Sequence, residues 1–409
     1  MKKRLFYLFA LICAVSLFTA CSDDDDNGGN NDNNATEALL NKVNTTYEGT
    51  TLDLDYSGSS MTGKSVTFLS KNGQTATITL SGAAVALTRE NSGFNLKNPG
   101  VIPGETSTVL NVTLESANEG FTFKGTETKE NFTINYDGSV KEGKMDIDLD
   151  VELKNNELIG TWNLKVMDPN NPSDKGAINP GWKSKTPFKV SLFPGVPASD
   201  WQPEGLLAFA SVMPLIPTSD ANTKLNAQEA ITKLLQKVEF KKDGNLTATY
   251  SETEHLLNPV WETSPMNMVQ FAVKENKLML YLNADAIINA ILAPKSTKAT
   301  EYNPMDAIMK ILPNLMKLTP MLEAGIPLSY RMEDENTLLV YIDKELGMQL
   351  FEAILPLFED AEFVAYIKKA ATSDPSFASF APMIESVIDQ LPAVIKGTET
   401  LELGLRFVK

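Results

Sequence analysis

The sequence predicts a β-rich α+β protein with two antiparallel β-barrel or sandwich domains, the second carrying helical insertions that cap one end. Three observations lead to this prediction. Short stretches of alternating apolar and polar residues recur from Tyr47 to Leu153, and again from Leu158 to the end of the chain. Turns rich in Gly, Asn and Asp separate these stretches. Long segments with apolar residues at helical spacing interrupt only the second set.

The first residues of the chain predict secretion. Lys2, Lys3 and Arg4 precede an apolar run from Leu5 to Leu17. This run is shorter than the roughly 20 residues that a membrane-spanning helix needs. A basic start followed by a short apolar core is typical of a secretory signal peptide. We therefore expect residues 1–20 to be removed.

Residues 18–26 carry the two most specific signals in the chain. Phe18-Thr19-Ala20-Cys21 resembles the bacterial lipobox, in which the cysteine is acylated and becomes the first mature residue. The run that follows resembles the surface-export signal of Bacteroidetes lipoproteins; it consists of Ser22, Asp23, Asp24, Asp25 and Asp26. The resemblance implies an outer-membrane protein that is anchored by lipid on Cys21 and faces the cell exterior.

Charge and cysteine content narrow the classes of partner. The chain has 36 basic and 52 acidic residues, a net charge of −16, which repels nucleic acids and anionic lipid head groups. Of its two cysteines, Cys13 lies in the signal peptide and Cys21 carries the lipid, so we expect no disulfide. Residues 21–46 are predicted to form a tether, with one short helix from Thr36 to Asn44.

Residues 47–157 are predicted to form an all-β domain. Alternating stretches follow one another at short spacing, and Asn72-Gly73 is a favoured hairpin turn. The stretch from Met145 to Val151 alternates apolar residues with aspartates throughout, which predicts a strand with one apolar and one charged face. About eight short antiparallel strands in roughly 110 residues favour a barrel or a sandwich.

Residues 158–409 are predicted to form the second β domain. Gly160-Thr161-Trp162 begins an alternating stretch and resembles the first strand of lipocalin-type, or calycin, barrels. An internal repeat relates the two domains, because residues 65–73 (SVTFLSKNG) parallel residues 237–244 (KVEFKKDG). The resemblance implies calycin-like folds for both domains. The alternative is that the two domains are unrelated, and that their segments align only because both consist of alternating strands.

In the second domain, tight turns alternate with long connections between the predicted strands. Tight turns are expected at Asp243-Gly244, Glu275-Asn276 and Asp334-Asn336, and long segments lie between the resulting hairpins. In an up-and-down meander, tight turns lie at one end and long connections at the other. The insertions are therefore predicted to build a cap of short helices over one rim. Several prolines, including Pro356 and Pro392, are expected to break or kink these helices.

The sequence offers little catalytic material. His255 is the only histidine, which argues against Ser-His-Asp, Cys-His and multi-histidine metal sites. No Gly-rich phosphate loop follows a strand, and we expect no cofactor or metal. Glycoside hydrolysis by a pair of carboxylates remains an alternative, although nothing in the sequence identifies which two acidic residues would form the pair. The alternating aspartates are interpreted as the solvated face of a sheet; they are Asp53, Asp55, Asp146, Asp148 and Asp150.

The predicted ligand site is the rim where the insertions meet. Aromatic, methionine and polar residues of the insertions are its candidates: Trp201, Trp261, Glu262, Met309, Met316, Phe351 and Phe380. Trp182 is expected at the opposite rim. These apolar residues either fill the barrel mouth or enclose a cavity.

The leading functional hypothesis is non-catalytic binding of a small amphipathic or glycan-like ligand outside the cell. The alternative is a structural or interaction component of a cell-surface protein complex with no small-molecule site. An enzyme is the third hypothesis.

Overall fold

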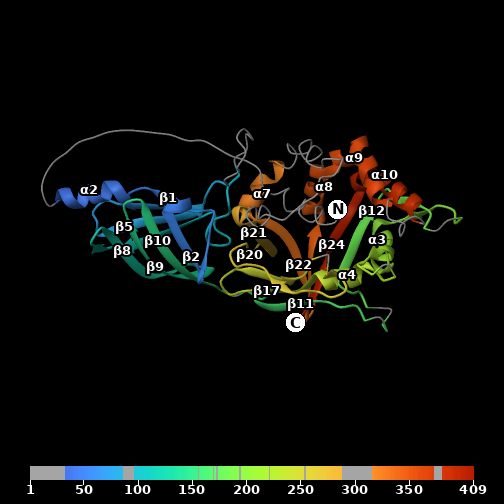
Figure 1. Ribbon diagram of the computed structural model, residues 1–409, viewed down its shortest axis with the longest axis horizontal. Coiled ribbons are helices and arrows are strands. Elements are labelled where there is room, and N and C mark those ends of the chain that lie inside the picture. The colour runs from blue at the N-terminus through green and yellow to red at the C-terminus, as the bar shows by residue number, and fades with distance from the viewer. Residues whose placement is uncertain are drawn as a thin grey trace.

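The computed structural model of the chain describes residues 33–85, 96–154, 156–168, 170–171, 174–192, 195–220, 222–252, 255–287, 316–372 and 380–409. The predicted signal peptide, Cys21, the export signal Ser22–Asp26 and Met309 lie outside the described residues. We call residues 33–154 the N-terminal half and residues 156–409 the C-terminal half. Figure 1 shows the two halves side by side along the long axis of the molecule.

The N-terminal half consists of one helix and two sheets that share a hydrophobic core. The sheets have the strand orders β1-β4-β5-β6 and β3-β2-β10-β9-β8-β7. The core joins Tyr47 and Phe68 of the first sheet to Leu54 and Ile134 of the second. The elements are α2 (Asn33–Val43), β1 (Thr46–Glu48), η1 (Gly49–Thr51), β2 (Leu52–Tyr56), β3 (Ser59–Ser60), β4 (Lys64–Ser70), β5 (Thr75–Gly82), β6 (Ser107–Thr113), β7 (Glu115–Ala117), β8 (Gly120–Thr128), β9 (Phe132–Lys141) and β10 (Lys144–Leu153).

Alternation in the sequence sets which side chains of these strands are buried. Met145, Ile147 and Leu149 of β10 are buried, while the aspartates between them lie on the other face, as predicted. One pairing differs from the expected antiparallel pattern, because β2 runs parallel to β10. The chain crosses from β1 in one sheet, through η1, to β2 in the other. This crossing lets β2 enter the second sheet in the same direction as β10.

The C-terminal half is organised around one large sheet with the order β19-β18-β17-β11-β24-β23-β22-β21-β20. Its β17/β18, β20/β21 and β22/β23 hairpins confirm the three predicted tight turns. Two small separate sheets pair β13 with β14 and β15 with β16. The strands of the half are β11 (Gly160–Leu164), β12 (Ile178–Ser184), β13 (Phe188–Val190), β14 (Ser199–Trp201), β15 (Ile216–Pro217), β16 (Lys224–Leu225), β17 (Leu235–Phe240), β18 (Leu246–Tyr250), β19 (Glu262–Thr263), β20 (Val269–Lys274), β21 (Lys277–Leu282), β22 (Ile326–Asp334), β23 (Thr337–Asp343) and β24 (Thr398–Val408).

The last strand, β24, connects the parts of this sheet. It pairs with β23 along one edge, and with both β11 and β12 along the other. Asn245, just before β18, forms an isolated bridge with Gln270 of β20, the strand at the sheet's far edge. The described strands therefore form a sheet that curls back toward itself without closing into a continuous barrel.

Helices cover one end of this sheet. The neighbours β21, β22, β23 and β24 alternate in direction, so the helical connections and the tight turns leave from opposite ends. Figure 1 shows α8, α9 and α10 gathered at the end away from the C-terminus. Pro356 and Pro392 were expected to break or kink the helices; each lies inside a continuous 16-residue helix, so neither breaks it. The helices are α3 (Pro203–Val212), α4 (Ala227–Leu234), η3 (Met316–Leu318), α7 (Thr319–Ala324), α8 (Lys344–Glu359), α9 (Ala361–Thr372) and α10 (Ala381–Lys396).

Hydrogen bonds that cross between the halves form a contact that we call the junction. The Tyr56 hydroxyl donates to the Asp243 carbonyl at 2.6 Å, and the Leu153 amide donates to the Lys242 carbonyl at 2.7 Å. The side-chain amides of two buried asparagines, Asn267 and Asn283, donate to carbonyls of the N-terminal half at 2.7 and 2.9 Å. Buried polar groups of this kind are satisfied only when the halves dock in one arrangement.

The junction predicts different effects for two buried tyrosines. Tyr56→Phe deletes the bond to Asp243 and leaves a buried carbonyl without that donor, so we expect a loss of about 1–2 kcal/mol in the free energy of unfolding. Tyr281→Phe is the matched control, because the buried Tyr281 hydroxyl has no hydrogen-bond partner. Chemical denaturation measures both. Equal losses in the two variants would contradict the assigned role of the Tyr56 hydroxyl.

Candidate functional site

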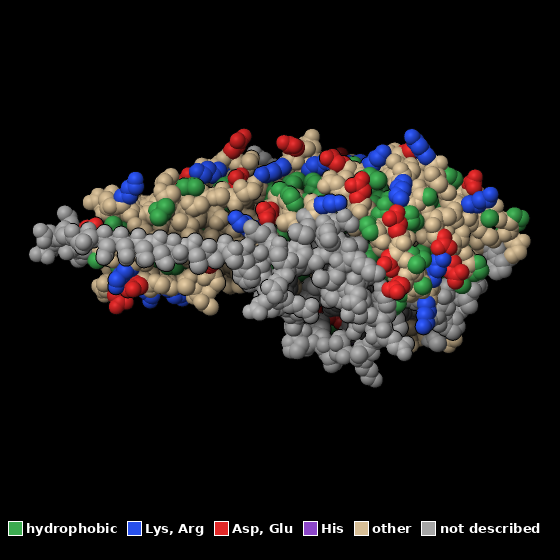
Figure 2. Space-filling model, turned by 90° about the horizontal axis from the view of Figure 1, so that it is seen from above, with side chains coloured by type: hydrophobic (Ala, Val, Ile, Leu, Met, Phe, Trp, Pro, Cys, Tyr) green, Lys and Arg blue, Asp and Glu red, His purple; other side chains and the backbone are tan. Residues whose placement is uncertain are grey.

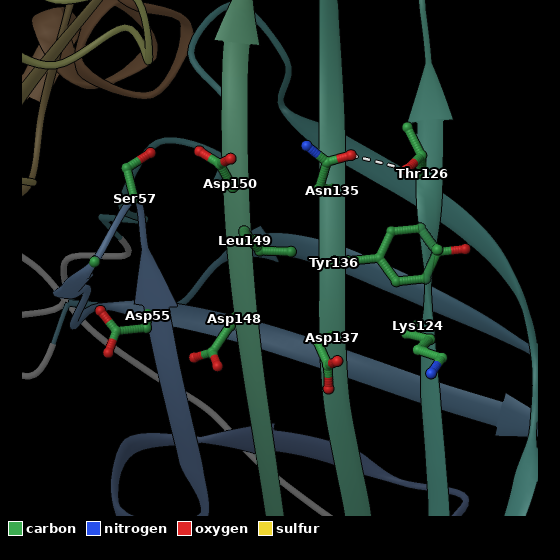
Figure 3. A pocket seen from close by; sticks show the side chains of 12 residues that line it. Asp55, Ser57, Lys124, Thr126, Asn135, Tyr136, Asp137, Asp148, Leu149 and Asp150 are labelled. Carbon is green, nitrogen blue, oxygen red and sulfur yellow. Dashed lines mark hydrogen bonds between the residues drawn. The ribbon is translucent and has the colours of Figure 1, made fainter.

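A trough of about 750 Å³ lies on the six-stranded sheet of the N-terminal half. Strands β2, β10, β9 and β8 supply its lining, together with the turn at Ser57 and Gly58 that follows β2. Figure 3 shows two rows of polar side chains that cross these strands. Between the rows lie Tyr136 and Leu149, which belong to the core-facing set of the sheet.

The first row is acidic at one end and basic at the other. Strand register places Asp148 directly opposite Asp55 of β2 and directly opposite Asp137 of β9. Lys124 of β8 lies opposite Asp137 and ends the row. Because neighbouring strands are about 4.8 Å apart, three carboxylates stand side by side.

The second row is mostly uncharged. Asp150 lies opposite Asn135, which in turn lies opposite Thr126. The Thr126 hydroxyl donates to the Asn135 side-chain oxygen at 2.8 Å. Ser57 has φ of 51° and a buried hydroxyl without a hydrogen-bond partner. The trough therefore combines carboxylates, an amide, hydroxyls and one ammonium group.

The carboxylates of the first row repel one another. Burial raises the pKa of Asp148 above its ordinary value, and the charges of Asp55 and Asp137 raise it further. Lys144 pairs with Asp146 at 2.9 Å and with Asp53 at 3.6 Å, both beside the trough. Within the part of the chain that the structure describes, no ion pair involves the three carboxylates of the first row.

The aspartates of β2 and β10 lie on the outer face of the sheet, as the alternation predicted. Among the described residues, no group of three or more His, Cys, Asp or Glu is arranged to hold a metal ion. The arrangement suits an extended ligand that meets several groups in turn.

Three of the predicted site residues come together under the helices. Trp201, Phe351 and Phe380 pack against a hydrophobic cluster that we call the cap cluster, whose buried members are Trp182, Phe188, Val190, Leu206, Met383, Val394, Ile395 and Leu401. The Trp182 ring lies 5.4 Å from the Phe351 ring, and its indole nitrogen donates to the Thr398 hydroxyl at 3.0 Å. Side chains in this cluster pack on one another.

The expected position of Trp182 at the opposite rim is wrong. Strand β12 pairs with the first residues of β24, directly after α10, and so carries Trp182 into the cap cluster. That pairing joins segments more than 200 residues apart, and local sequence patterns do not contain it.

The other predicted site residues are not gathered there. Trp261 is 37% exposed and precedes β19, where Glu262 is also exposed, at an edge of the large sheet. Met316 begins η3, and its side chain is not among those described. Met309 lies outside the described residues. The alternating aspartates of the sequence predicted that this face of the sheet is solvated. They did not predict the strand register that aligns the aspartates into the trough.

A serine, a lysine and an aspartate meet on the large sheet. Ser329 lies 2.7 Å from both the Lys277 amine and the Asp343 carboxylate, and the amine also bonds to that carboxylate. Asp343 accepts the Leu346 amide at the start of α8. Burial opposes ionisation of Asp343, but these bonds lower its pKa below the ordinary value. An ammonium paired in this way is no base for Ser329, so the group fastens α8 to the sheet.

No family model, curated protein or solved structure matches this chain.

In the described part of the chain, no helix is both long and apolar enough to span a membrane.

The aligned carboxylates predict that Asp148→Asn stabilises the protein. Removing a charge between two like charges should raise the free energy of unfolding at pH 7 by a few tenths of a kcal/mol, because solvent screens the repulsion. The raised pKa means that wild-type Asp148 is uncharged at low pH, so the difference should vanish as the pH falls through that pKa. Denaturation at pH 7 and pH 3 measures it. A variant less stable than wild type at pH 7 would refute the interpretation.

Proposed function

We propose that this protein is a non-catalytic binding protein held at the outer membrane, on the exterior of the cell, by lipid on Cys21. The support for anchoring and export is the sequence of residues 18–26, which resembles a lipobox followed by an acidic export signal. Residues 27–32 then form the tether to two β-rich domains, 47–157 and 158–409, because α2 already packs into the core through Leu40 and Val43.

We further propose that the second domain has a calycin-like fold, with a sheet that curls without closing. Trp162 of the Gly160-Thr161-Trp162 motif is fully buried and donates to the Leu158 carbonyl at 2.8 Å. The last strand returns to pair with the strand that carries this motif, and the Lys409 amine lies 4.6 Å from the centre of the Trp162 ring. A cation over an indole face is stabilising, so the end of the chain secures the first strand of the sheet.

The ligand in this proposal is small, polar and glycan-like, and it binds in the trough. The observation that carries the proposal is a cavity of about 750 Å³ lined by side-chain acceptors and donors at regular spacing. Binding sites for small molecules usually have volumes of about 300–1,000 Å³. Hydroxyl groups along a sugar chain both donate and accept, which suits carboxylates, Asn135 and Lys124. The cap cluster offers packed apolar side chains in place of such groups.

One observation favours the alternative, an interaction component of a surface complex. Residues 205–217 contain no charged residue, and Leu207 and Val212 on α3 are 36% and 45% exposed. Elsewhere, Figure 2 shows charged side chains of both signs scattered over the C-terminal half. An apolar surface of this kind suits a protein partner. Loss of a co-purifying protein from a Leu207→Asp, Val212→Asp variant would favour this alternative.

Binding in the trough predicts a difference between two neighbouring aspartates. Asp148→Asn should weaken the affinity for an oligosaccharide identified by array screening at least tenfold, or about 1.4 kcal/mol. Asp146→Asn is the matched control, because Asp146 lies on the same face of β10 but outside the lining. Titration calorimetry measures both affinities. Equal affinities for both variants and wild type would place the ligand elsewhere.

The anchor has its own test in the producing cell. Cys21→Ala should abolish incorporation of labelled fatty acid and release the protein from the membrane fraction. Replacement of Asp23, Asp24, Asp25 and Asp26 by Ala should retain the lipid but protect the protein from protease added to intact cells. Fatty-acid labelling of the Cys21→Ala protein, or unchanged protease sensitivity of the other variant, would overturn the corresponding part of the proposal.

A further inference from the structure

A buried lysine and a buried asparagine lie close together beside the junction. Lys64, at the start of β4, is 3% exposed, and Asn98 is also 3% exposed. The Lys64 amine donates to the carbonyls of Pro99 and Gly100 at 2.9 Å each, so it is held by the two residues that directly follow Asn98. A lysine is almost never this deeply buried without an acidic partner at contact distance.

The hydrogen bonds of the Asn98 side-chain amide activate its carbonyl carbon for attack by a nucleophile. Its oxygen accepts the backbone N–H groups of Ala284 and Asp285 at 2.9 and 3.4 Å. Two such donors withdraw electron density from the carbonyl and stabilise negative charge that develops on its oxygen. Its nitrogen donates to the Asp285 carboxylate at 2.9 Å. A carboxylate at that position can deliver a proton to the departing nitrogen.

Two glycines keep the space around these groups clear. Gly82 lies opposite Lys64, and a side chain on Gly82 would collide with the main-chain oxygen of Asn98, 1.7 Å from its Cβ position. Gly63 precedes Lys64, and its Cβ position lies 2.8 Å from both the Asn98 nitrogen and the Asp285 carboxylate. Glycine at these positions therefore lets the main chain beside Lys64 lie close to Asn98 and to the Asp285 carboxylate.

We propose that Lys64 and Asn98 join in an intramolecular amide bond, with Asp285 transferring the protons. Rotation of the lysine side chain brings its uncharged amine from the Pro99 carbonyl to the side-chain carbonyl carbon of Asn98. The new C–N bond forms as an electron pair moves to the Asn98 oxygen, which the Ala284 and Asp285 amides stabilise. Asp285 accepts a proton from the lysine nitrogen and passes it to the asparagine nitrogen. The C–N bond of the original amide then breaks, ammonia leaves and the carbonyl re-forms.

This reaction needs no oxidant, metal or cofactor, because an amine and a primary amide are converted to a secondary amide and ammonia. The nucleophile must be uncharged, and burial lowers the pKa of Lys64 to about 7, although Asp285 opposes that shift. Amide formation also removes the cost of a buried ammonium group. The product keeps one N–H to donate to a carbonyl of Pro99 or Gly100.

Mass spectrometry of the intact protein tests this proposal directly. The wild-type protein should be about 17 Da lighter than its sequence requires, the mass of one ammonia. Trypsin should not cleave after Lys64, so residues 43–71 should appear joined to residues 98–124 in one branched fragment. The full sequence mass, with separate peptides ending at Lys64 and beginning at Asn98, would overturn the proposal without any variant.

Variants assign the roles of the residues. Lys64→Arg should have the full sequence mass, and Asp285→Asn should retain the ammonia or lose it far more slowly. Lys97→Arg is the matched control, because Lys97 adjoins Asn98 in the chain but is exposed, and this variant should lose ammonia as the wild type does. A Lys64→Arg protein that still lacked one ammonia would place the reaction at other residues and overturn the assignment.

Discussion

Hydrogen bonds between buried amide side chains and backbone groups at the junction set the relative position of the two halves. Asn98, Asn267 and Asn283 bond across the junction, and each is only 3% or 4% exposed. An amide buried without partners costs about 1–3 kcal/mol, so each of these residues penalises any other docking arrangement. Asn267 also adopts a φ of 60°, a conformation that asparagine tolerates better than most residues. The junction thus specifies one arrangement more than it adds net stability.

This constraint gives the proposed site its rigidity. The trough is built on strands of a sheet, and β2, one of these strands, ends at Tyr56, which bonds to the C-terminal half. Side chains on such strands keep their spacing when a ligand binds, which reduces the entropy lost on binding. The row formed by Asp55, Asp148 and Asp137 stores repulsion that a sheet selected only for stability would avoid. Binding sites commonly retain such unfavourable contacts.

Local patterns predicted the elements of the fold, but not the contacts between distant segments. The strand from Met145 to Val151 and the turn at Asp243-Gly244 follow from period-two alternation and turn chemistry, and both are present. The parallel pairing of β2 with β10 depends on the path of the chain between sheets, which alternation does not encode. The position of Trp182 depends on a pairing between β12 and β24.

For the functional features too, local patterns were predictable from the sequence and contacts between distant segments were not. Aspartates on one face of a strand are visible in the sequence, whereas the trough exists because the register aligns three strands. The junction asparagines resemble ordinary loop residues in the sequence, since asparagine is common in turns. Trp201, Phe351 and Phe380 were correctly expected to lie near the helices, yet the sequence left open whether they line a cavity or pack together.

Differential scanning calorimetry of the full chain tests the central structural claim most directly. If the junction unites the halves, the protein should unfold in one transition, with a calorimetric enthalpy equal to the van't Hoff enthalpy. The same midpoint should appear for tryptophan fluorescence, which reports on the C-terminal half because all four tryptophans lie there, and for far-ultraviolet circular dichroism, which reports on both halves. Two separate transitions, or different midpoints for the two probes, would show that the halves fold independently and would contradict this account.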